Sequence, residues 1–138
     1  MTHINIASLE VGQVIGTTEF LLTRDSLVRY AGASGDFNPI HYRDDFAQSV
    51  GLDGVLAHGM LTMALVGKYI SDFAGGAANV LEFGARFTKP VIIPAGENVD
   101  LTVSATVSEI VDGKISLTVS ATSAGVKVLG MAKAVVRK

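Results

Sequence analysis

An aspartate and a histidine lie five residues apart in the most polar stretch of the chain, and this pair could carry acid–base chemistry. Asp36 and His41 stand on either side of Asn38-Pro39. Because Pro39 fixes its own φ angle and disfavours a helical conformation at Asn38, we expect a rigid, non-helical loop. A carboxylate and an imidazole held together in such a loop can exchange protons with a substrate. The residues leave open which of the two is the acid and which is the base.

The same residues also have structural interpretations. Aspartate often makes turns or caps helices, and Asn-Pro is an ordinary loop signature. A single histidine in a loop is more often exposed or hydrogen-bonded than catalytic. Asn38 either braces the loop or forms a simple turn. Taken alone, the loop is therefore explained better by structure than by catalysis.

A long apolar segment follows the loop and is predicted to form a central helix. The stretch from Gly59 to Ala74 is apolar at nearly every position, which is typical of a helix that is surrounded by protein on most sides. Gly59 would place a backbone N–H at the helix N-terminus, where the helix dipole favours developing negative charge. The segment is too short, and too polar after Val66, to cross a bilayer.

The residues before the loop are predicted to form a strand and then a helix. The strand is expected at Thr17 to Leu22, and the Thr23 hydroxyl is placed to cap a helix that extends to residue 30 or 31. This helix must stop within residues 32–35, where small residues let the backbone turn. Arg43 to Ser49 is predicted to be a second, short helix.

Beyond the central helix, the hydrophobic period changes to two. Apolar and polar residues alternate over residues 99–108 and again over residues 115–122, which predicts two half-buried strands. Asp112-Gly113 lies between them and is a strong signal for a tight hairpin turn.

Two more strands complete the expected sheet. Leu81 to Thr88 is predicted to enter it, and Val126 to Val136 is predicted to be a fourth long strand after a turn at residues 123–125. The last strand has apolar residues on both faces, so we expect both faces to be covered. Together these elements predict an α+β fold in which an antiparallel sheet wraps one apolar helix.

Composition narrows the possible classes of protein. At 138 residues, with 49% hydrophobic and 17% charged residues, we expect a single domain over residues 1–138. The chain has no cysteine, which excludes disulfides, thiolate nucleophiles and zinc–thiolate sites within it. The formal net charge of −2 argues against general nucleic-acid binding. Residues 1–5 lack a basic region leading into an apolar run, so we expect no secretory signal and a cytoplasmic protein.

The order of residues in the loop and helix resembles the hydratase motif of the MaoC-like (R)-specific enoyl hydratases and dehydratases. The motif runs through Tyr30-Ala31-Gly32-x-Ser34-Gly35-Asp36-x-Asn38-Pro39-Ile40-His41, then Gly51-Leu52-Asp53, then Ala57-His58-Gly59-Met60-Leu61. Within the family, the chain is most similar to the HadB-type catalytic subunit of (3R)-hydroxyacyl-carrier-protein dehydratases. The similarity extends through Arg86-Phe87-Thr88 and Pro90-Val91 to the end of the chain.

The resemblance implies a single hot-dog fold, with a central helix at about residues 59–74 wrapped by the sheet. It implies a hydro-lyase of fatty acid metabolism that dehydrates (3R)-hydroxyacyl thioesters or hydrates trans-2-enoyl thioesters, carried by acyl carrier protein or coenzyme A. It implies no metal and no organic cofactor. Two hot dogs would pair side by side around an acyl tunnel, either as a homodimer or as a heterodimer with a related subunit, and no nucleic acid or membrane would be a partner.

The resemblance also assigns roles to residues. Asp36 and His41 would be the catalytic pair, partly withdrawn from water beside Phe37 and Ile40. The Gly59 backbone N–H would be the oxyanion donor, with Asn38 in support. His58, apart from the resemblance, is expected to be structural and to fix the loop before the helix, and its adjacency to Gly59 leaves a supporting role open. Some related hydratases place a serine facing the site farther along the central helix, whereas this stretch reads Leu65-Val66-Gly67 and leaves that contact absent.

Two other functions fit the same fold. A hot-dog acyl thioesterase would need a carboxylate or amide that directs water to the carbonyl, and the loop of Asp36 and His41 does not resemble such a site. A non-catalytic subunit that shapes a partner's acyl tunnel would be marked by loss of Asp36 or His41, and the sequence has both. Arg86 and Lys89 are either solvated charges or groups that steer a phosphate.

Overall fold

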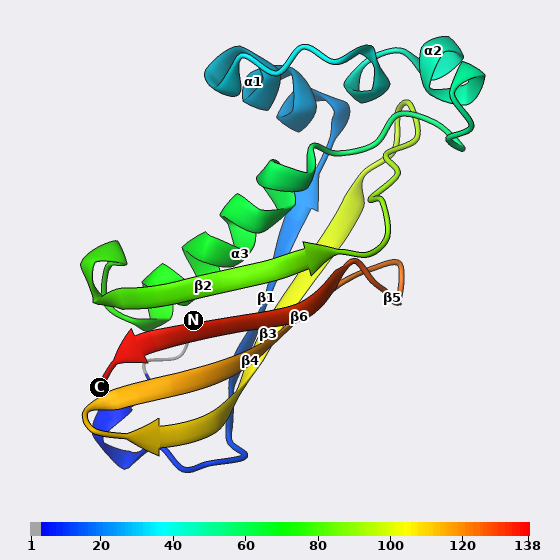
Figure 1. Cartoon of the computed structure of the whole chain (residues 1–138). Helices are drawn as coiled ribbons and strands as arrows, with labels where there is room; N and C mark the ends of the chain where they lie inside the picture. Colours follow the sequence, from blue (N-terminus) through cyan, green and yellow to red (C-terminus); the bar gives the residue numbers. More distant parts are fainter. Residues whose placement is uncertain (1–3) are drawn as a thin grey trace.

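A six-stranded antiparallel sheet lies against one central helix, α3, in the computed structural model, which describes residues 4–138 (Figure 1). The prediction that residues 1–5 form no secretory signal falls partly on residues 1–3, which lie outside the described residues. The strand order is β1-β3-β4-β6-β2, and β5 pairs with β4. The α-helices are α1 (Arg24–Ser34), α2 (Asp44–Ser49) and α3 (Gly59–Phe73), and the 3-10 helices are η1 (Ile6–Ser8), η2 (Pro39–His41) and η3 (Ala77–Asn79). The strands are β1 (Val14–Leu22), β2 (Val80–Phe87), β3 (Val99–Val111), β4 (Lys114–Ser123), β5 (Val126–Lys127) and β6 (Leu129–Arg137).

The core lies between α3 and the inner face of the sheet. On β3 and β4 the period-two pattern buries alternate apolar residues, as predicted, because successive side chains point to opposite faces of a strand. The buried residues of this core include Val66, Tyr69, Ile70 and Phe73 of α3, Leu101, Val103, Ala105 and Val107 of β3, and Ile115, Leu117, Val119 and Ala121 of β4. This arrangement confirms the α+β, hot-dog expectation.

Helix α1 begins as predicted and runs farther than residue 31. The Thr23 hydroxyl accepts a hydrogen bond from the Ser26 N–H, and the Ser26 hydroxyl accepts one from the Thr23 N–H, which together form a capping box. The helix continues through Ser34, and Gly35 then adopts a left-handed conformation with φ of 76°. Glycine adopts this conformation at little cost, so Gly35 ends the helix.

The β3–β4 hairpin matches its prediction, and the last strand does not. Asp112 and Gly113 have φ angles of 51° and 71°, as a tight hairpin turn requires. The predicted strand over residues 126–136 is interrupted at Val128 and divides into β5 and β6.

The expectation that both faces of this strand are covered was wrong. Met131 has φ of 48° and lies at a bulge in β6. The bulge is seen in the pairing of β6 with β2, which shifts by one residue between Gly84 and Arg86. After the bulge, the side chains that point to the core are the even-numbered ones instead of the odd-numbered ones. Leu129 is buried before the bulge, and Ala132, Ala134 and Val136 are buried after it. Met131 itself is 65% exposed.

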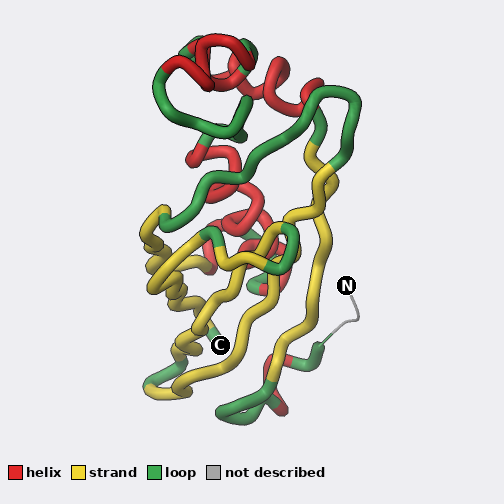
Figure 2. Tube along the Cα trace, turned by 90° about the vertical axis from the view of Figure 1, so that its right-hand side faces the viewer, coloured by secondary structure: helices red, strands yellow, loops and turns green. Residues whose placement is uncertain are grey.

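The helices α1 and α2 and the connection between them lie beyond one end of the sheet, next to the start of α3 (Figure 1, Figure 2). Arg24 ties this region together. Its Nε donates to the Ile93 carbonyl oxygen at 2.6 Å, and its Nη2 donates to both carboxylate oxygens of Asp44 at 2.9 and 3.0 Å. The Asp44 carboxylate also accepts the Val55 N–H at 3.1 Å. We call these four residues the Arg24 clasp. None of the helices within residues 4–138 has the length and apolar character needed to span a membrane.

Candidate active site

The loop between α1 and α2 folds back on itself and brings Asp36 close to His41. The Asn38 N–H donates to the Asp36 carboxylate at 3.1 Å, and the Asn38 side-chain oxygen accepts the Ile40 N–H at 3.2 Å. Asn38 is non-helical, as predicted. The expectation of a non-helical loop fails at residues 39–41, which form the single 3-10 turn η2, since proline is well suited to the first position of a helical turn. Asn38 thus braces the loop through both its backbone and its side chain.

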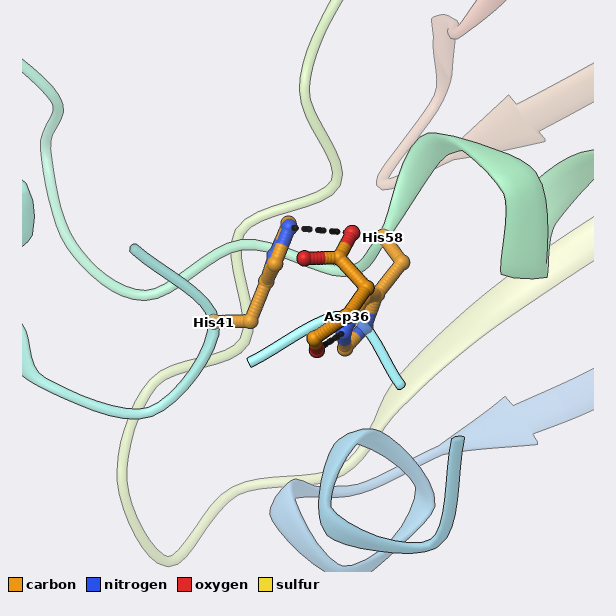
Figure 3. Close-up of side chains that lie close together, drawn as sticks. All are labelled: Asp36, His41 and His58. Carbon is orange, nitrogen blue, oxygen red and sulfur yellow. Dashed lines mark hydrogen bonds and ion pairs between the residues drawn. The ribbon is translucent and has the colours of Figure 1, made fainter. Parts of the chain in front are cut away.

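His41 is buried and held in one orientation. Its Nδ1 lies 2.7 Å from the Leu56 carbonyl oxygen. Because a carbonyl can only accept, the neutral ring carries its proton on Nδ1 and leaves a lone pair on Nε2. Nε2 faces the Asp36 carboxylate at 3.9 Å, which is too long for a direct hydrogen bond (Figure 3). The geometry presents a proton acceptor next to a carboxylate.

Exposure differs sharply between the two members of the pair. The His41 side chain is 8% exposed, as expected for a group withdrawn from water, whereas the Asp36 side chain is 51% exposed. The expectation was therefore wrong for Asp36. Phe37 is itself 61% exposed and does not cover the carboxylate. The Asp36 carboxylate lies on the surface of the single chain.

His58, at the N-cap of α3, joins this pair, although the sequence indicated only a supporting role. It is 1% exposed, and its Nε2 donates to the Asp36 backbone carbonyl at 3.1 Å (Figure 3). Its ring stacks on the His41 ring with centroids 3.8 Å apart and planes 20° apart, and it meets the Tyr30 ring edge-on at 4.8 Å. Burial lowers the pKa of His58, although the bond to the Asp36 carbonyl opposes the shift.

A metal ion does not fit these three side chains as they lie. One ligand atom from each of Asp36, His41 and His58 falls within 4.8 Å of the other two. However, imidazole binds metals through lone pairs in the plane of the ring, and stacked rings direct those lone pairs along nearly parallel planes. One nitrogen of each ring is also committed to a backbone carbonyl. The cluster is arranged for proton transfer and hydrogen bonding.

Gly59 is the first residue of α3 and lies against an aromatic ring. The His58 carbonyl accepts the N–H groups of Leu61 and Thr62. Because Gly59 begins α3, no carbonyl of the helix itself can accept its N–H. A Cβ atom added to Gly59 would come within 3.2 Å of the Phe87 ring. Glycine therefore leaves a helix N-terminal N–H open beside the ring.

A pocket of about 290 Å³ opens beside Gly59 and is lined mainly by apolar side chains. Thr62 lines it one turn into α3 and is 3% exposed. Thr62 was not predicted as a site residue. The only feature in the sequence that marks it is its hydroxyl group within an otherwise apolar helix. The pocket is lined by Leu56, Ala57, Gly59, Thr62, Phe87, Thr88, Lys89, Pro90, Val91, Val128 and Leu129. A larger hollow of about 770 Å³ shares part of this wall, and none of Asp36, His41 or His58 lines either cavity.

The serine of some related hydratases has no counterpart at its expected position. Gly67 occupies that stretch, and a Cβ atom there would lie 3.6 Å from the Phe83 ring, which is an ordinary contact distance. Space for a small side chain exists, and the chain uses glycine.

The chain matches a known protein family and is similar to proteins of known activity. The family described as MaoC like domain matches residues 7–127. The chain is 36% identical over 74 residues to 3-hydroxyacyl-thioester dehydratase X of Mycobacterium tuberculosis, which is 54% of this chain and 25% of that protein. It is 34% identical over 85 residues to the mitochondrial 3-hydroxyacyl-[acyl-carrier-protein] dehydratase of Arabidopsis thaliana, covering 62% of this chain and 50% of the relative. The chain thus spans half or less of the length of these two relatives.

A solved structure has the same fold as this chain over most of the length of both proteins. The R-hydratase PhaJ1 from Pseudomonas aeruginosa superposes with a TM-score of 0.80 at 29% identity, covering 95% of this chain and 83% of the other. The family match spans most of the sequence, and the fold matches along nearly its entire length. The chain therefore belongs to the MaoC-like domain family.

Proposed function

We propose that this chain is an (R)-specific 3-hydroxyacyl thioester dehydratase, and equally a trans-2-enoyl thioester hydratase. The observation that carries the proposal is a free His41 Nε2 that faces the Asp36 carboxylate. His58 bonds this loop to the N-terminus of α3, where Gly59 lines an apolar pocket. The relatives named as dehydratases and the superposed R-hydratase support the same reaction. The acyl chain would be carried by acyl carrier protein or coenzyme A.

In the hydration direction, one water molecule would donate to both Asp36 and His41. The two groups face each other as acceptors across 3.9 Å, a separation that a shared donor can bridge. His41 Nε2 takes a proton from the water as the water oxygen bonds to C3 of the enoyl group. The imidazolium then gives its proton to C2, so H and OH have been added across the double bond and His41 is neutral again. Asp36 orients the water and stabilises the imidazolium.

The thioester oxygen gains negative charge when C3 is attacked. The Gly59 N–H would donate to this oxygen, and the α3 dipole would strengthen the interaction. The acyl chain would extend into the apolar pocket past Thr62 and Phe87. Dehydration follows the same path in reverse, since one site must catalyse both directions, and substrate supply sets the direction.

A second hot-dog subunit is part of the proposal. The Asp36 carboxylate is half exposed, and large apolar side chains are exposed on the edge strand β2 (Leu81 38%, Phe87 55%), on α3 (Met60 56%) and on β6, the neighbour of β2 (Met131 65%). A partner docked on this edge would cover them and enclose the acyl chain. The partner is either a second copy or a related subunit.

An assay of the purified protein with crotonyl and longer trans-2-enoyl thioesters tests the proposal. Absorbance of the conjugated double bond should fall, and the product should be the (3R)-hydroxyacyl thioester. Release of free thiol without loss of the double bond would indicate a thioesterase. If the chain alone gives no reaction but reacts after a related hot-dog subunit is added, then either this chain is catalytic within the pair or it only shapes the acyl tunnel of the other subunit. Asp36→Asn would abolish that activity if this chain is catalytic and leave it intact if it only shapes the tunnel.

A further inference from the structure

A buried histidine with an unpartnered nitrogen contacts both members of the catalytic pair, and the proposed reaction does not use it. His58 is 1% exposed, and its Nδ1 has no hydrogen-bond partner within residues 4–138. A buried acceptor without a partner lowers stability, so its presence at a reactive site calls for an explanation. A hydrophobic side chain would fill the same space without that cost.

We propose that His58 is the positioning residue of the catalytic pair: its Nε2–H fixes the Asp36 backbone, and its ring supports the ring of His41. The inference rests on the proposed function, because it assigns His58 a role within that reaction. His58 itself transfers no proton.

The first contact fixes where the Asp36 carboxylate lies. That carboxylate is half exposed, and within residues 4–138 the only hydrogen bond it accepts is the one from the Asn38 N–H. The loop backbone must therefore hold it, and the His58 Nε2–H bond to the Asp36 carbonyl comes from the rigid N-terminus of α3. This bond couples the loop to the same helix that presents the Gly59 N–H.

The second contact fixes the His41 ring. The bond from Nδ1 to the Leu56 carbonyl sets the direction of the ring, and stacking on His58 at 3.8 Å limits tilting about that bond. Tyr30 of α1 packs edge-on against His58 at 4.8 Å and supports it. Nε2 of His41 is thereby held toward Asp36 (Figure 3).

The role requires a neutral His58. When His41 becomes an imidazolium during the reaction, a second positive charge on the stacked ring would repel it. Protonation of His58 would put a hydrogen on Nδ1, where no acceptor is within reach, in a site that already disfavours charge. The unpartnered nitrogen thus keeps the supporting ring uncharged.

Two substitutions separate the contacts. His58→Gln keeps an N–H donor at the same distance along the side chain and removes the ring, whereas His58→Phe keeps a flat ring and removes the donor. We expect each to lower kcat by roughly 10- to 100-fold, with a much smaller change in KM, because small misplacements of reacting groups have effects of this size. Unchanged kcat in both folded variants would overturn the inference.

Double variants test whether His58 acts through the pair. The effect of His58→Phe on kcat should largely vanish in an Asp36→Asn background, and the effect of His58→Gln should largely vanish in a His41→Ala background. A merely structural His58 would give effects that multiply in every background and follow the loss of melting temperature. That result would overturn the inference.

The protonation state of His58 is testable without activity. With three histidines in the chain, their imidazole ¹⁵N signals can be assigned by single substitutions. His58 should remain neutral, with Nδ1 unprotonated, at pH values at which an exposed histidine is already charged, because burial lowers its pKa. A charged His58 near neutral pH would overturn the inference, and this measurement also decides it if His58→Phe does not fold. A wild-type protein that hydrates no enoyl thioester would instead overturn the proposed function.

Discussion

At the scale of single residues, the site depends on which of its two ring nitrogens each histidine uses for a hydrogen bond to the backbone. His41 commits Nδ1 to the Leu56 carbonyl and keeps Nε2 for chemistry, while His58 commits Nε2 to the Asp36 carbonyl and keeps Nδ1 buried. The tautomers are therefore opposite. The nitrogen that each ring leaves without a hydrogen bond decides its role, because His41 directs the lone pair of that nitrogen toward the Asp36 carboxylate.

Loss of either catalytic group should stop turnover without unfolding the chain. We expect Asp36→Asn and His41→Ala each to lower kcat by at least about two orders of magnitude, as general acid–base groups do. Melting temperature should change little for Asp36→Asn, since that side chain is half exposed. Steady-state hydration of crotonyl thioester and thermal unfolding measure the two effects. Activity within a few-fold of wild type in either folded variant would exclude that residue from the chemistry.

Substitution of Gly59 should damage catalysis more than folding. A side chain at Gly59 would meet the Phe87 ring and crowd the place proposed for the thioester oxygen, so Gly59→Ala and Gly59→Val should lower kcat progressively. Helix propensity alone predicts a gain of up to about 1 kcal/mol of stability, since glycine is among the least favourable residues in a helix, and no catalytic defect.

Gly67→Ala is the matched control for this prediction. It lies on the same helix, where an added Cβ atom makes only an ordinary contact, and it should keep near-normal turnover. The kcat values of folded variants decide between the two expectations. Near-normal turnover in Gly59→Val would move the oxyanion donor elsewhere.

The sequence predicted Asp36, His41 and Gly59 as site residues because they belong to one long ordered motif, and the structure brings Asp36 and His41 to 3.9 Å from each other. It missed the contacts that come from distant parts of the chain. Phe87 reaches Gly59 from β2, and His58 reaches the Asp36 carbonyl across the loop. The exposure of Asp36 was also missed, since the direction of the Phe37 side chain is set by the fold rather than by its neighbours in sequence.

At the scale of elements, the Arg24 clasp joins the catalytic loop to the sheet. Arg24 stands at the start of α1, Asp44 at the start of α2, Val55 just before α3, and Ile93 between β2 and β3. The Val55 N–H and then Arg24 lower the pKa of Asp44. A carboxyl with a lowered folded-state pKa stabilises the fold above its unfolded pKa, and this contribution is lost as pH falls through the folded value.

Breaking the clasp should therefore cost stability at neutral pH and progressively less in acid. We expect Arg24→Ala to lower the melting temperature by a few degrees at pH 7, and the difference from wild type to shrink below about pH 4 as Asp44 becomes protonated in both proteins. Arg43→Ala is the matched control, because the pair of Arg43 and Asp45 is exposed and should contribute little. A pH-independent difference for Arg24→Ala would assign its effect to packing or to the Ile93 bond instead.

Element boundaries were predictable where the pattern is local. Alternation located β3 and β4, and Asp112-Gly113 located their turn. The bulge within β6 was not predictable, because a left-handed methionine such as Met131 has no signature in sequence. Helix α1 passes through Gly32, since one helical glycine costs only about 1 kcal/mol and Gly35 is the residue that adopts the left-handed turn.

At the scale of the whole molecule, the sheet ends in two different edges. β1 and β2 are the outer strands, and each carries exposed large apolar side chains, Val14 and Leu21 on β1 and Leu81 and Phe87 on β2. The β2 edge differs in that its Phe87 ring lies beside Gly59 at the start of α3. An open apolar edge favours association with another chain. We expect the purified protein to be a homodimer at micromolar concentration.

Substitutions on the two edges should separate assembly from folding. Leu81→Lys combined with Met131→Lys places charge on β2 and on its neighbour β6 and should shift light scattering toward the monomer, with loss of activity. Val14→Lys, at an exposed site on β1, should leave the dimer intact. A stable, active wild-type monomer would defeat this prediction. An insoluble chain that only co-expression rescues would indicate an obligate partner of a different sequence.

The backbone around the catalytic loop has a consequence for its dynamics. The Leu56 N–H donates to the Ile40 carbonyl at 3.2 Å, the Ala57 N–H to the Val91 carbonyl at 2.9 Å, and the Ile93 N–H to the Val55 carbonyl at 2.9 Å. These bonds cross-link residues 39–41, 55–57 and 91–93, so none of the three segments can open without the others. In native-state hydrogen exchange, the amides of Leu56, Ala57 and Ile93 should therefore exchange with one shared opening free energy, below that of the β3–β4 core. Arg24→Ala should accelerate all three by the same factor, and unequal factors would mean that the site opens in pieces.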